Sequence, residues 1–279
     1  MTLGLLHPGE MGASVGAAAR AHTEVLWASH GRSDATRRRA ETSGLVDAGD
    51  LDAVVDECGI VISICPPHAA LDLATRVAGR GFAGIYVDAN AVSPTTTMAI
   101  AQRIAAGGGR FLDGGIIGPP THRAGTTRLF LAGDEAARVA KIFAGSPLEA
   151  ICLAAGPPAA SALKMAYAAY TKGSAALLVA VRALARCHGV EGALLDEWHA
   201  SLPDLVRRSE TATLRNAPKA WRFMGEMDEI ASTFESAGLP DGFHRAAGEI
   251  YRRLERFKDD AAADLDALLA AILECEHEV

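Results

Sequence analysis

Short apolar runs alternate with stretches of helical periodicity over roughly the first 153 residues. The apolar runs predict β-strands at residues 2–6, 25–28, 60–64, 85–87, 110–117, 127–131 and 150–153. Helical stretches fill most of the gaps, for instance residues 11–21, 68–77 and 94–106. This alternation is typical of repeated strand-helix-strand units, which build a mostly parallel sheet.

The pattern changes after Gly156-Pro157-Pro158. No further β-rich run follows, and helical periodicity continues through a long apolar stretch at residues 159–188. Later helical segments break near Gly192, Pro203, Pro218 and residues 239–242. We therefore expect an α/β fold in which residues 1–155 form a sheet-containing domain and residues 156–279 form an all-helical domain.

The length and charge of the chain limit the classes of molecule that it is expected to bind. A chain of 279 residues is long enough for two domains, each with its own core. Its formal net charge of -7 does not favour binding to nucleic acid or to an anionic membrane surface. The stretch at residues 159–185 has the length of a membrane span, but Lys164 and Lys172 interrupt it, so we interpret it as a buried helix of a soluble protein.

Cysteine and histidine residues indicate neither disulfides nor a metal site. The five cysteines are scattered singly, which favours a reducing cytoplasm, and no cationic leader precedes an apolar core at the N-terminus. The cysteines are Cys58, Cys65, Cys152, Cys187 and Cys275. No histidine has metal-ligand spacing, and the four considered are His68, His122, His199 and His244. We assign no metal.

A glycine-containing turn follows the first predicted strand and opens the first helix. Gly9 would let phosphates approach the backbone, Gly12 would let the helix pack closely on the strand, and the amides of the helix N-terminus would bind the anion. His7 replaces the first glycine of G-x-G-x-x-G, so an ordinary strand-helix turn is the alternative. The residues predicted to contact the cofactor here are His7, Pro8, Gly9, Glu10 and Met11.

The end of the second predicted strand indicates which dinucleotide binds. An NAD site usually carries Asp or Glu there, whereas residues 25–29 contain no acid. Ser29, Arg32 and Ser33 instead stand where a 2′-phosphate would lie, which favours NADP(H). The side chains of residues 37–39, all arginine, are expected to be solvated at the start of a helix.

These residues resemble the β-hydroxyacid dehydrogenase superfamily, which includes 6-phosphogluconate dehydrogenase, 3-hydroxyisobutyrate dehydrogenase and the imine reductases. The landmarks, in order, are Gly9-x-Met11-Gly12, Cys65-Pro66-Pro67, residues 88–94, residues 113–118 and Lys164. The resemblance implies an N-terminal Rossmann-type domain and a homodimer with intertwined helical domains. Residues 216–244 are similar to a poorly characterised phosphogluconate-dehydrogenase-like branch.

Lys164 is the candidate catalytic residue. Its apolar neighbours would desolvate the ammonium and lower its pKa, as a proton shuttle requires, although a lone lysine on a helix commonly reaches to solvent. The resemblance implies the catalytic role, but relatives place an asparagine one turn later, where this chain has Tyr167 and Ala168. Tyr167 could donate a proton or pack in the core, and Thr171 shares the Lys164 face.

The resemblance also assigns residues around the substrate and the nicotinamide. Ile117 and Gly118 stand where dehydrogenase relatives bind a substrate carboxylate through a serine and two glycines. Because the serine hydroxyl is missing here, a bulkier or less polar substrate is favoured. Asn90 is expected near the nicotinamide ribose, or in a plain turn. Pro66 should line the nicotinamide side of the cleft, and Cys65 beside it could equally be a buried hydrophobe.

The leading hypothesis is an NADPH-dependent oxidoreductase that transfers hydride between nicotinamide and a β-hydroxy acid or related carbonyl compound, with Lys164 as general acid and base. An imine reductase is one alternative, although those enzymes generally carry Asp or Tyr at the Lys164 position. A non-catalytic NADPH-binding sensor is another. His244 could reach the partner subunit's cleft or pack locally.

Overall fold

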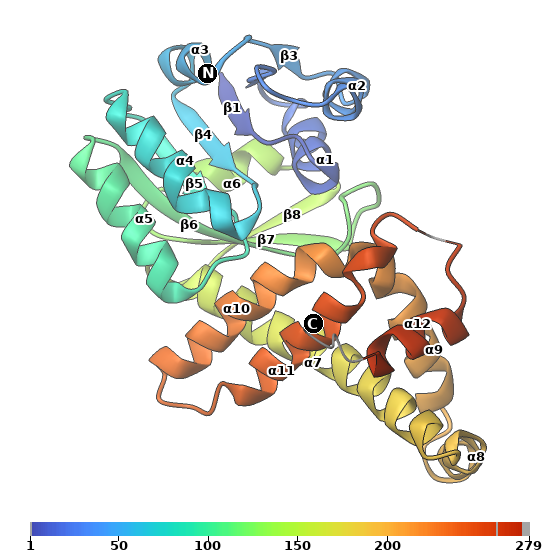
Figure 1. The fold of residues 1–279 in the computed structure, drawn as a ribbon. Coiled ribbons are helices and arrows are strands. Elements are labelled where there is room, and N and C mark those ends of the chain that lie inside the picture. The colour runs from blue at the N-terminus through green and yellow to red at the C-terminus, as the bar shows by residue number, and fades with distance from the viewer. Residues whose placement is uncertain (1, 261, 275–279) are drawn as a thin grey trace, which may run out of the picture. The chain divides into compact units, whose positions relative to one another are not determined.

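The computed structural model describes residues 2–260 and 262–274, so Cys275 lies outside the described residues. The chain divides into two compact units between Met165 and Ala166, and helix α7 (Ala159–Cys187) runs through the division (Figure 1). The predicted boundary at residues 155–156 lies in the loop just before this helix. None of the helices in the described residues is long and apolar enough to cross a membrane.

The first unit is built on one eight-stranded sheet with the order β3-β2-β1-β4-β5-β6-β7-β8. All neighbouring strands are parallel except β6 and β7, which are antiparallel. The strands are β1 (Leu3–Leu6), β2 (Val25–Trp27), β3 (Val46–Asp47), β4 (Ile60–Ser63), β5 (Ile85–Asp88), β6 (Arg110–Ile117), β7 (Thr127–Ala132) and β8 (Leu148–Cys152). The prediction of a mostly parallel sheet followed by a helical region is confirmed.

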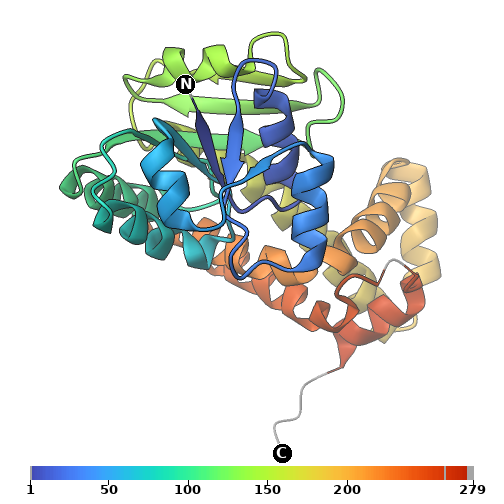
Figure 2. The ribbon, with the colours of Figure 1, turned by 90° about the horizontal axis from the view of Figure 1, so that it is seen from above.

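Helices cover both faces of this sheet (Figure 1 and Figure 2). One apolar layer joins the sheet to α1 and α6, and a second joins its other face to α3, α4 and α5. Leu5 and Leu6 on β1 belong to different layers, because successive strand side chains point to opposite faces. The helices are α1 (Glu10–Ala19), α2 (Asp34–Thr42), α3 (Leu51–Glu57), α4 (Pro67–Gly79), α5 (Pro94–Ala106), α6 (Ala136–Ala140) and the 3₁₀ turn η1 (Lys141–Phe143).

A buried carboxylate fixes the start of α7 against β6. Asp113 accepts hydrogen bonds from the backbone N–H of Ala160 at 2.7 Å, the N–H of Ser161 at 3.1 Å and the Ser161 hydroxyl at 2.5 Å. These bonds satisfy donors that a helix N-terminus otherwise leaves free. Burial raises the pKa of Asp113, and the bonds from Ser161 and Ala160 oppose that shift.

Gly115 makes this approach possible. A Cβ atom on Gly115 would lie 2.5 Å from the carbonyl oxygen of Ala160, far inside van der Waals contact. The Thr97 hydroxyl on α5 also donates to the Ser161 hydroxyl, at 2.8 Å. The first turn of α7 is therefore held by both a central strand and a neighbouring helix.

The second unit consists of helices joined by buried ion pairs. Arg182 on α7 is almost fully buried, and its guanidinium Nε lies 2.9 Å from the Glu191 carboxylate, which also accepts from Arg186 at 2.7 Å. Lys172 pairs with Glu226. Beyond α7 the elements are α8 (Glu191–Ser201), α9 (Leu205–Asn216), η2 (Ala217–Lys219), α10 (Ala220–Ser236), α11 (Gly242–Arg253), η3 (Glu255–Phe257) and α12 (Leu265–Leu273).

Removing the Asp113 carboxylate tests how much the fold depends on it. We expect Asp113→Ala to lower the free energy of unfolding by about 2–4 kcal/mol, because two buried N–H groups and a hydroxyl lose their acceptor. Asp113→Asn should cost less, since one acceptor oxygen remains. The exposed Asp134 on the same sheet unit provides the control, and its alanine variant should change stability by less than about 0.5 kcal/mol in chemical denaturation. Equal effects at both positions would contradict the proposed anchoring.

Candidate active site

The turn between β1 and α1 leaves an open helix N-terminus. His7 has a left-handed φ of 68°, and its carbonyl oxygen accepts from the Gly9 N–H at 2.8 Å. A Cβ atom on Gly12 would lie 2.3 Å from that same carbonyl oxygen, so the turn requires glycine there. The space where a Gly9 Cβ would stand is open, and no side chain caps α1. An anion can therefore approach the first amides of α1.

Arg37 shapes the loop after β2. Its guanidinium donates to the carbonyl of Ser29 at 2.8 Å and to the carbonyl of Arg32 at 3.3 Å. Ser33 caps α2 by accepting from the N–H of Thr36. Arg37 is exposed, in line with the expectation of a solvated side chain, and it also bonds the two carbonyls that define this loop.

The turn and the loop together form an electropositive site. Within the described part of the chain, the Nδ1 atom of His7 and the Nε atom of Arg32 are buried and have no hydrogen-bond partner. Burial, and then the charges of Arg32 and Arg76, lower the pKa of His7 to about 4. No carboxylate of the described residues lies within ion-pair distance of Arg32. An unsatisfied buried N–H of the Arg32 guanidinium, beside positive charge that no carboxylate compensates, fits an anionic group of a dinucleotide.

Asn90 organises the carboxyl ends of β4 and β5. Its side-chain oxygen accepts from the N–H of Cys65 at 2.6 Å, and its side-chain amide donates to the Ser63 hydroxyl at 3.1 Å and to the Asp88 carboxylate. The side chain is buried. Asn90 therefore positions the Cys65-Pro66 loop, whereas its direct contact with a ribose stays a prediction.

The Cys65-Pro66 loop is structural in character. Burial raises the pKa of the Cys65 thiol to about 12, so the thiol stays protonated near neutral pH. Pro66 is exposed and immediately precedes α4. Cys65 therefore behaves as the buried hydrophobe that the sequence left open as one interpretation.

Lys164 lies on the second turn of α7, against the carboxyl-terminal half of β6. Its ammonium donates to the carbonyl oxygen of Ile116 at 2.7 Å, and its Cβ would be 3.3 Å from a Cβ on Gly115. No carboxylate of the residues that the structure describes forms an ion pair with it. Burial lowers the pKa of Lys164 from 10.5 to about 8. Such an amine can both accept and donate a proton near neutral pH.

Comparisons with known proteins show a fold of the 3-hydroxyacid dehydrogenase type. It is 33% identical over 198 residues to an uncharacterised 28.5 kDa protein of Methanothermus fervidus, covering 70% of this chain and 75% of that protein. A conserved protein of unknown function, described as similar in structure to 3-hydroxyacid dehydrogenases, is 27% identical with a TM-score of 0.67, covering 92% of this chain and 97% of that one. The chain belongs to the β-hydroxyacid dehydrogenase superfamily.

Two better-characterised members of the superfamily share the fold. The 3-hydroxyisobutyrate dehydrogenase of Mycobacterium tuberculosis is 18% identical with a TM-score of 0.72, covering 98% of this chain and 99% of that one. A reductive aminase of Aspergillus terreus, solved with NADPH4, cyclohexanone and allyl amine, is 16% identical with a TM-score of 0.57, covering 96% and 98%. Residues 185–254 match a family model described as a domain of unknown function, DUF1932.

Relative to the superfamily pattern, the substrate-side residues are less polar. Ile117 is buried at the end of β6 and Gly118 follows it, so this position offers no hydroxyl. Tyr167 lies on α7 beyond the division of the units and is 50% exposed. The Thr171 hydroxyl donates to the Tyr167 carbonyl at 3.1 Å, within the same helix. Their roles toward substrate stay predictions.

His244 packs locally in the second unit. Its ring centroid lies 4.2 Å from that of Phe234 and 5.2 Å from that of Phe243. Burial lowers the pKa of His244, and its Nδ1 atom has no hydrogen-bond partner. Among the described residues, no group of three or more His, Cys, Asp or Glu side chains is arranged to hold a metal ion.

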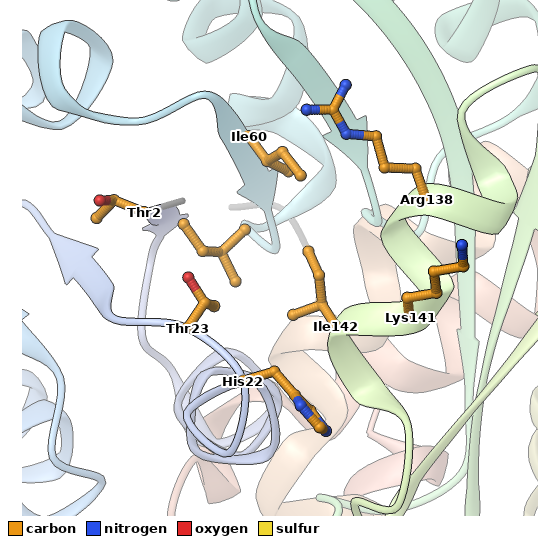
Figure 3. Close-up of a pocket in the computed structure, with 8 residues that line it drawn as sticks. Thr2, His22, Thr23, Ile60, Arg138, Lys141 and Ile142 are labelled. Carbon is orange, nitrogen blue, oxygen red and sulfur yellow. The ribbon is translucent and has the colours of Figure 1, made fainter.

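Of two cavities in the first unit, one lies apart from the predicted cofactor contacts and the other includes one of them, Glu10. One, of about 190 Å³, sits at the amino ends of β1 and β4, where Figure 3 shows His22, Arg138 and Lys141 around Ile60. The other, of about 310 Å³, is lined by α1 and α2 and includes Arg39. In sheets of this type nucleotides bind at the carboxyl ends of the strands, so the first cavity is at the opposite edge.

The pKa of Lys164 can be measured by ¹³C-methylation of lysines and NMR. We expect one resonance, absent from Lys164→Arg, to titrate at about 8. Because an unfolded lysine titrates near about 10.4, the folded protein binds fewer protons than the unfolded chain between these values. The stability of the wild type relative to Lys164→Met should therefore rise as the pH increases through this window. A Lys164 resonance that titrates above about 10 would show that burial leaves the amine unperturbed.

Proposed function

We propose that this protein is an NADPH-dependent oxidoreductase that transfers hydride between nicotinamide and a β-hydroxy acid or related carbonyl compound. The observation that carries the proposal is Lys164, whose pKa is about 8 and whose only hydrogen bond to the described residues is to the neutral Ile116 carbonyl. Lys164 lies against β6, which belongs to the same sheet as β1. The strand β1 leads into the open turn at Gly9. Membership of the dehydrogenase superfamily supports the same chemistry.

Lys164 would move the proton that accompanies hydride transfer. The bound nicotinamide supplies the hydride acceptor or donor. In the oxidative direction the neutral amine takes the proton of the substrate hydroxyl, and in the reductive direction the ammonium returns a proton to the carbonyl oxygen. Ile116 orients the amine by accepting one N–H bond, which leaves the other positions of Nζ available to substrate.

The β2 loop supports NADP(H) over NAD(H). The loop contains no carboxylate that could bind a ribose 2′-hydroxyl, and Arg32 offers a guanidinium whose Nε is buried and unsatisfied. Arg37 holds the carbonyls of Ser29 and Arg32, so the loop is preorganised. The Aspergillus terreus reductive aminase of the same fold was solved with NADPH4.

A reductive aminase or imine reductase is the second candidate. The absence of a hydroxyl at Ile117 and the exposed phenol of Tyr167 favour a less polar substrate than a small hydroxy acid. Lys164 favours alcohol chemistry, because it can exchange a proton with an oxygen in both directions. A non-catalytic NADPH sensor would need the turn at Gly9 but not Lys164.

Lys164→Ala separates catalysis from sensing. With NADPH or NADP, hydroxy acids, keto acids and cyclic imines would be screened by the absorbance of the reduced cofactor. We expect kcat on the best substrate to fall by about 10²–10⁴ because the proton shuttle is lost, while NADPH affinity measured by calorimetry stays within about twofold.

Lys141→Ala, which removes an exposed lysine from η1, serves as the charge-matched control and should keep wild-type turnover. Turnover by Lys164→Ala equal to that of the control would refute the catalytic role. Binding of NADPH without turnover of any of these substrate classes would favour the sensor.

We further propose a cytoplasmic homodimer formed through helical domains. Tyr170, Leu177 and Leu184 on α7 are 68%, 48% and 58% exposed. Their spacing of seven residues places them on one face of the helix, as in helices that pair with a partner. Exposed large apolar side chains aligned in this way are typical of a protein interface.

A charged residue in this stripe should prevent dimerisation. We expect light scattering to give twice the chain mass for the wild type and the chain mass for Leu177→Glu, because the interface would have to bury an unpaired carboxylate. Leu214→Glu places the same charge on α9, at an apolar residue that is 44% exposed, and should remain dimeric. A monomeric wild type, or a dimeric Leu177→Glu, would contradict this interface.

A further inference from the structure

The loop between β6 and β7 begins at Gly118, one of the predicted substrate residues. It spans residues 118–126 and lies beside α1 (Figure 1). Its two ends are fixed to each other, because the Thr127 hydroxyl donates to the Pro119 carbonyl at 2.6 Å. A Cβ atom on Gly118, whose φ is 129°, would lie 2.3 Å from the carbonyl oxygen of Thr126. The base of the loop is therefore closed by its own hydrogen bond and close packing.

One hydrogen bond attaches the middle of this loop to α1. The Ser14 hydroxyl accepts from the backbone N–H of Thr121 at 3.0 Å and donates to the carbonyl oxygen of Met11 at 2.9 Å. Ser14 and Thr121 are buried, with exposed fractions of 4% and 5%. Within the described part of the chain, no other hydrogen bond joins residues 118–126 to α1. This attachment thus depends on a single side chain.

A cavity of about 310 Å³ borders the attachment. Its walls are the start of α1, which includes Ser14, the end of α2, and Pro120 and His122 of the loop. Residues 122–125, at the tip of the loop, are exposed. Because side chains do not fill this space, packing contributes little to holding the loop against α1. Breaking the Ser14 bond would therefore release the middle of the loop.

Ser14 is also bonded to the turn that is predicted to bind the cofactor. Met11, whose carbonyl accepts from the Ser14 hydroxyl, lies in the first turn of α1 and is one of the residues expected to contact the dinucleotide. Helix ends fray, and an anion bound at the first amides of α1 would stabilise this turn. The Ser14 hydroxyl, oriented by Met11, would then keep its lone pairs available to the Thr121 N–H. An ordered turn and an ordered loop therefore favour each other.

We infer that Ser14 is a positioning residue that couples the cofactor turn to the loop after β6, so that binding of NADPH orders the loop that follows the predicted substrate residues. This inference rests on the proposed function. Ser14 acts through Thr121 and needs no contact with the substrate. Because coupling between two binding events is reciprocal, a substrate bound against the loop would raise the affinity for NADPH by the same factor.

Hydrogen exchange of the Thr121 amide, followed by NMR, tests the coupling before any substrate is known. We expect saturating NADPH to slow this exchange by about 10-fold or more in the wild type. In Ser14→Ala the amide should exchange faster than in the wild type, and NADPH should change its rate by less than about twofold, because the acceptor is missing. Ser14→Thr keeps the hydroxyl and places its extra methyl group beside the cavity, so the response to NADPH should return.

Ser43→Ala provides the matched control. Ser43 lines the same cavity from α2, but its hydroxyl forms no hydrogen bond with the described residues, so this variant should respond to NADPH as the wild type does. On the best substrate of the screen, Ser14→Ala should raise KM by about 2–10-fold, as expected for one hydrogen bond. Its kcat should stay within about twofold, because Lys164 is held by separate contacts with β6.

The outcomes distinguish the coupling from the proposed function. A wild type that binds NADPH in calorimetry without slower exchange at Thr121 would overturn the coupling and leave the proposed function intact. A response to NADPH that persists in Ser14→Ala, or that is absent from Ser14→Thr, would also overturn it, because the hydroxyl would then not carry the effect. A wild type that does not bind NADPH refutes the proposed function, and the coupling with it.

Discussion

The contact between the Asp113 carboxylate and the N-terminus of α7 sets the position of Lys164. A carboxylate in a central strand is costly to bury unless its oxygens accept hydrogen bonds, and only α7 supplies them through Ala160 and Ser161. Three residues further along each element, Lys164 meets the Ile116 carbonyl. The register of helix against strand thus follows from the cap, and Gly115 allows the close approach that the cap requires.

Positively charged side chains are paired with carboxylates in the helical unit but not near the carboxyl ends of β1 and β2. Arg182 and Lys172 in the second unit are paired with Glu191 and Glu226, as buried cations usually are. Arg32 and Arg76 have no such partners among the described residues, although the chain has 34 Asp and Glu residues against 27 Lys and Arg. The positive charges of these unpaired arginines are not neutralised by a carboxylate. An anionic ligand that binds beside them would lower the electrostatic free energy of the site.

The sequence was informative wherever a residue's role depends on its local pattern. The buried parallel strands appear as apolar runs, and every predicted strand is present with small shifts at its ends. β3 was missed because its two residues are exposed and have no apolar pattern. The breaks at Pro203, Pro218 and residues 239–242 separate helices as predicted, whereas Gly192 lies inside α8 and the break falls before it.

Roles that depend on distant partners could not be predicted in this way. Asn90 bonds to Cys65, which is 25 residues away in the chain, and Asp113 bonds to Ser161, 48 residues away. The one available signal for Asp113 was a carboxylate within an otherwise apolar strand, which must find donors somewhere in the fold.

The neutral partner of Lys164 has a consequence for the substrate. A carboxylate beside the amine would hold its pKa high, whereas the Ile116 carbonyl leaves burial to lower the pKa to about 8. The pKa of Lys164 in the complex then depends mainly on the charge of the bound substrate. A substrate carboxylate next to Nζ would raise the pKa and keep Lys164 protonated at neutral pH, which is the form that reduction requires. An uncharged ketone or alcohol would leave the amine able to act in both directions at neutral pH.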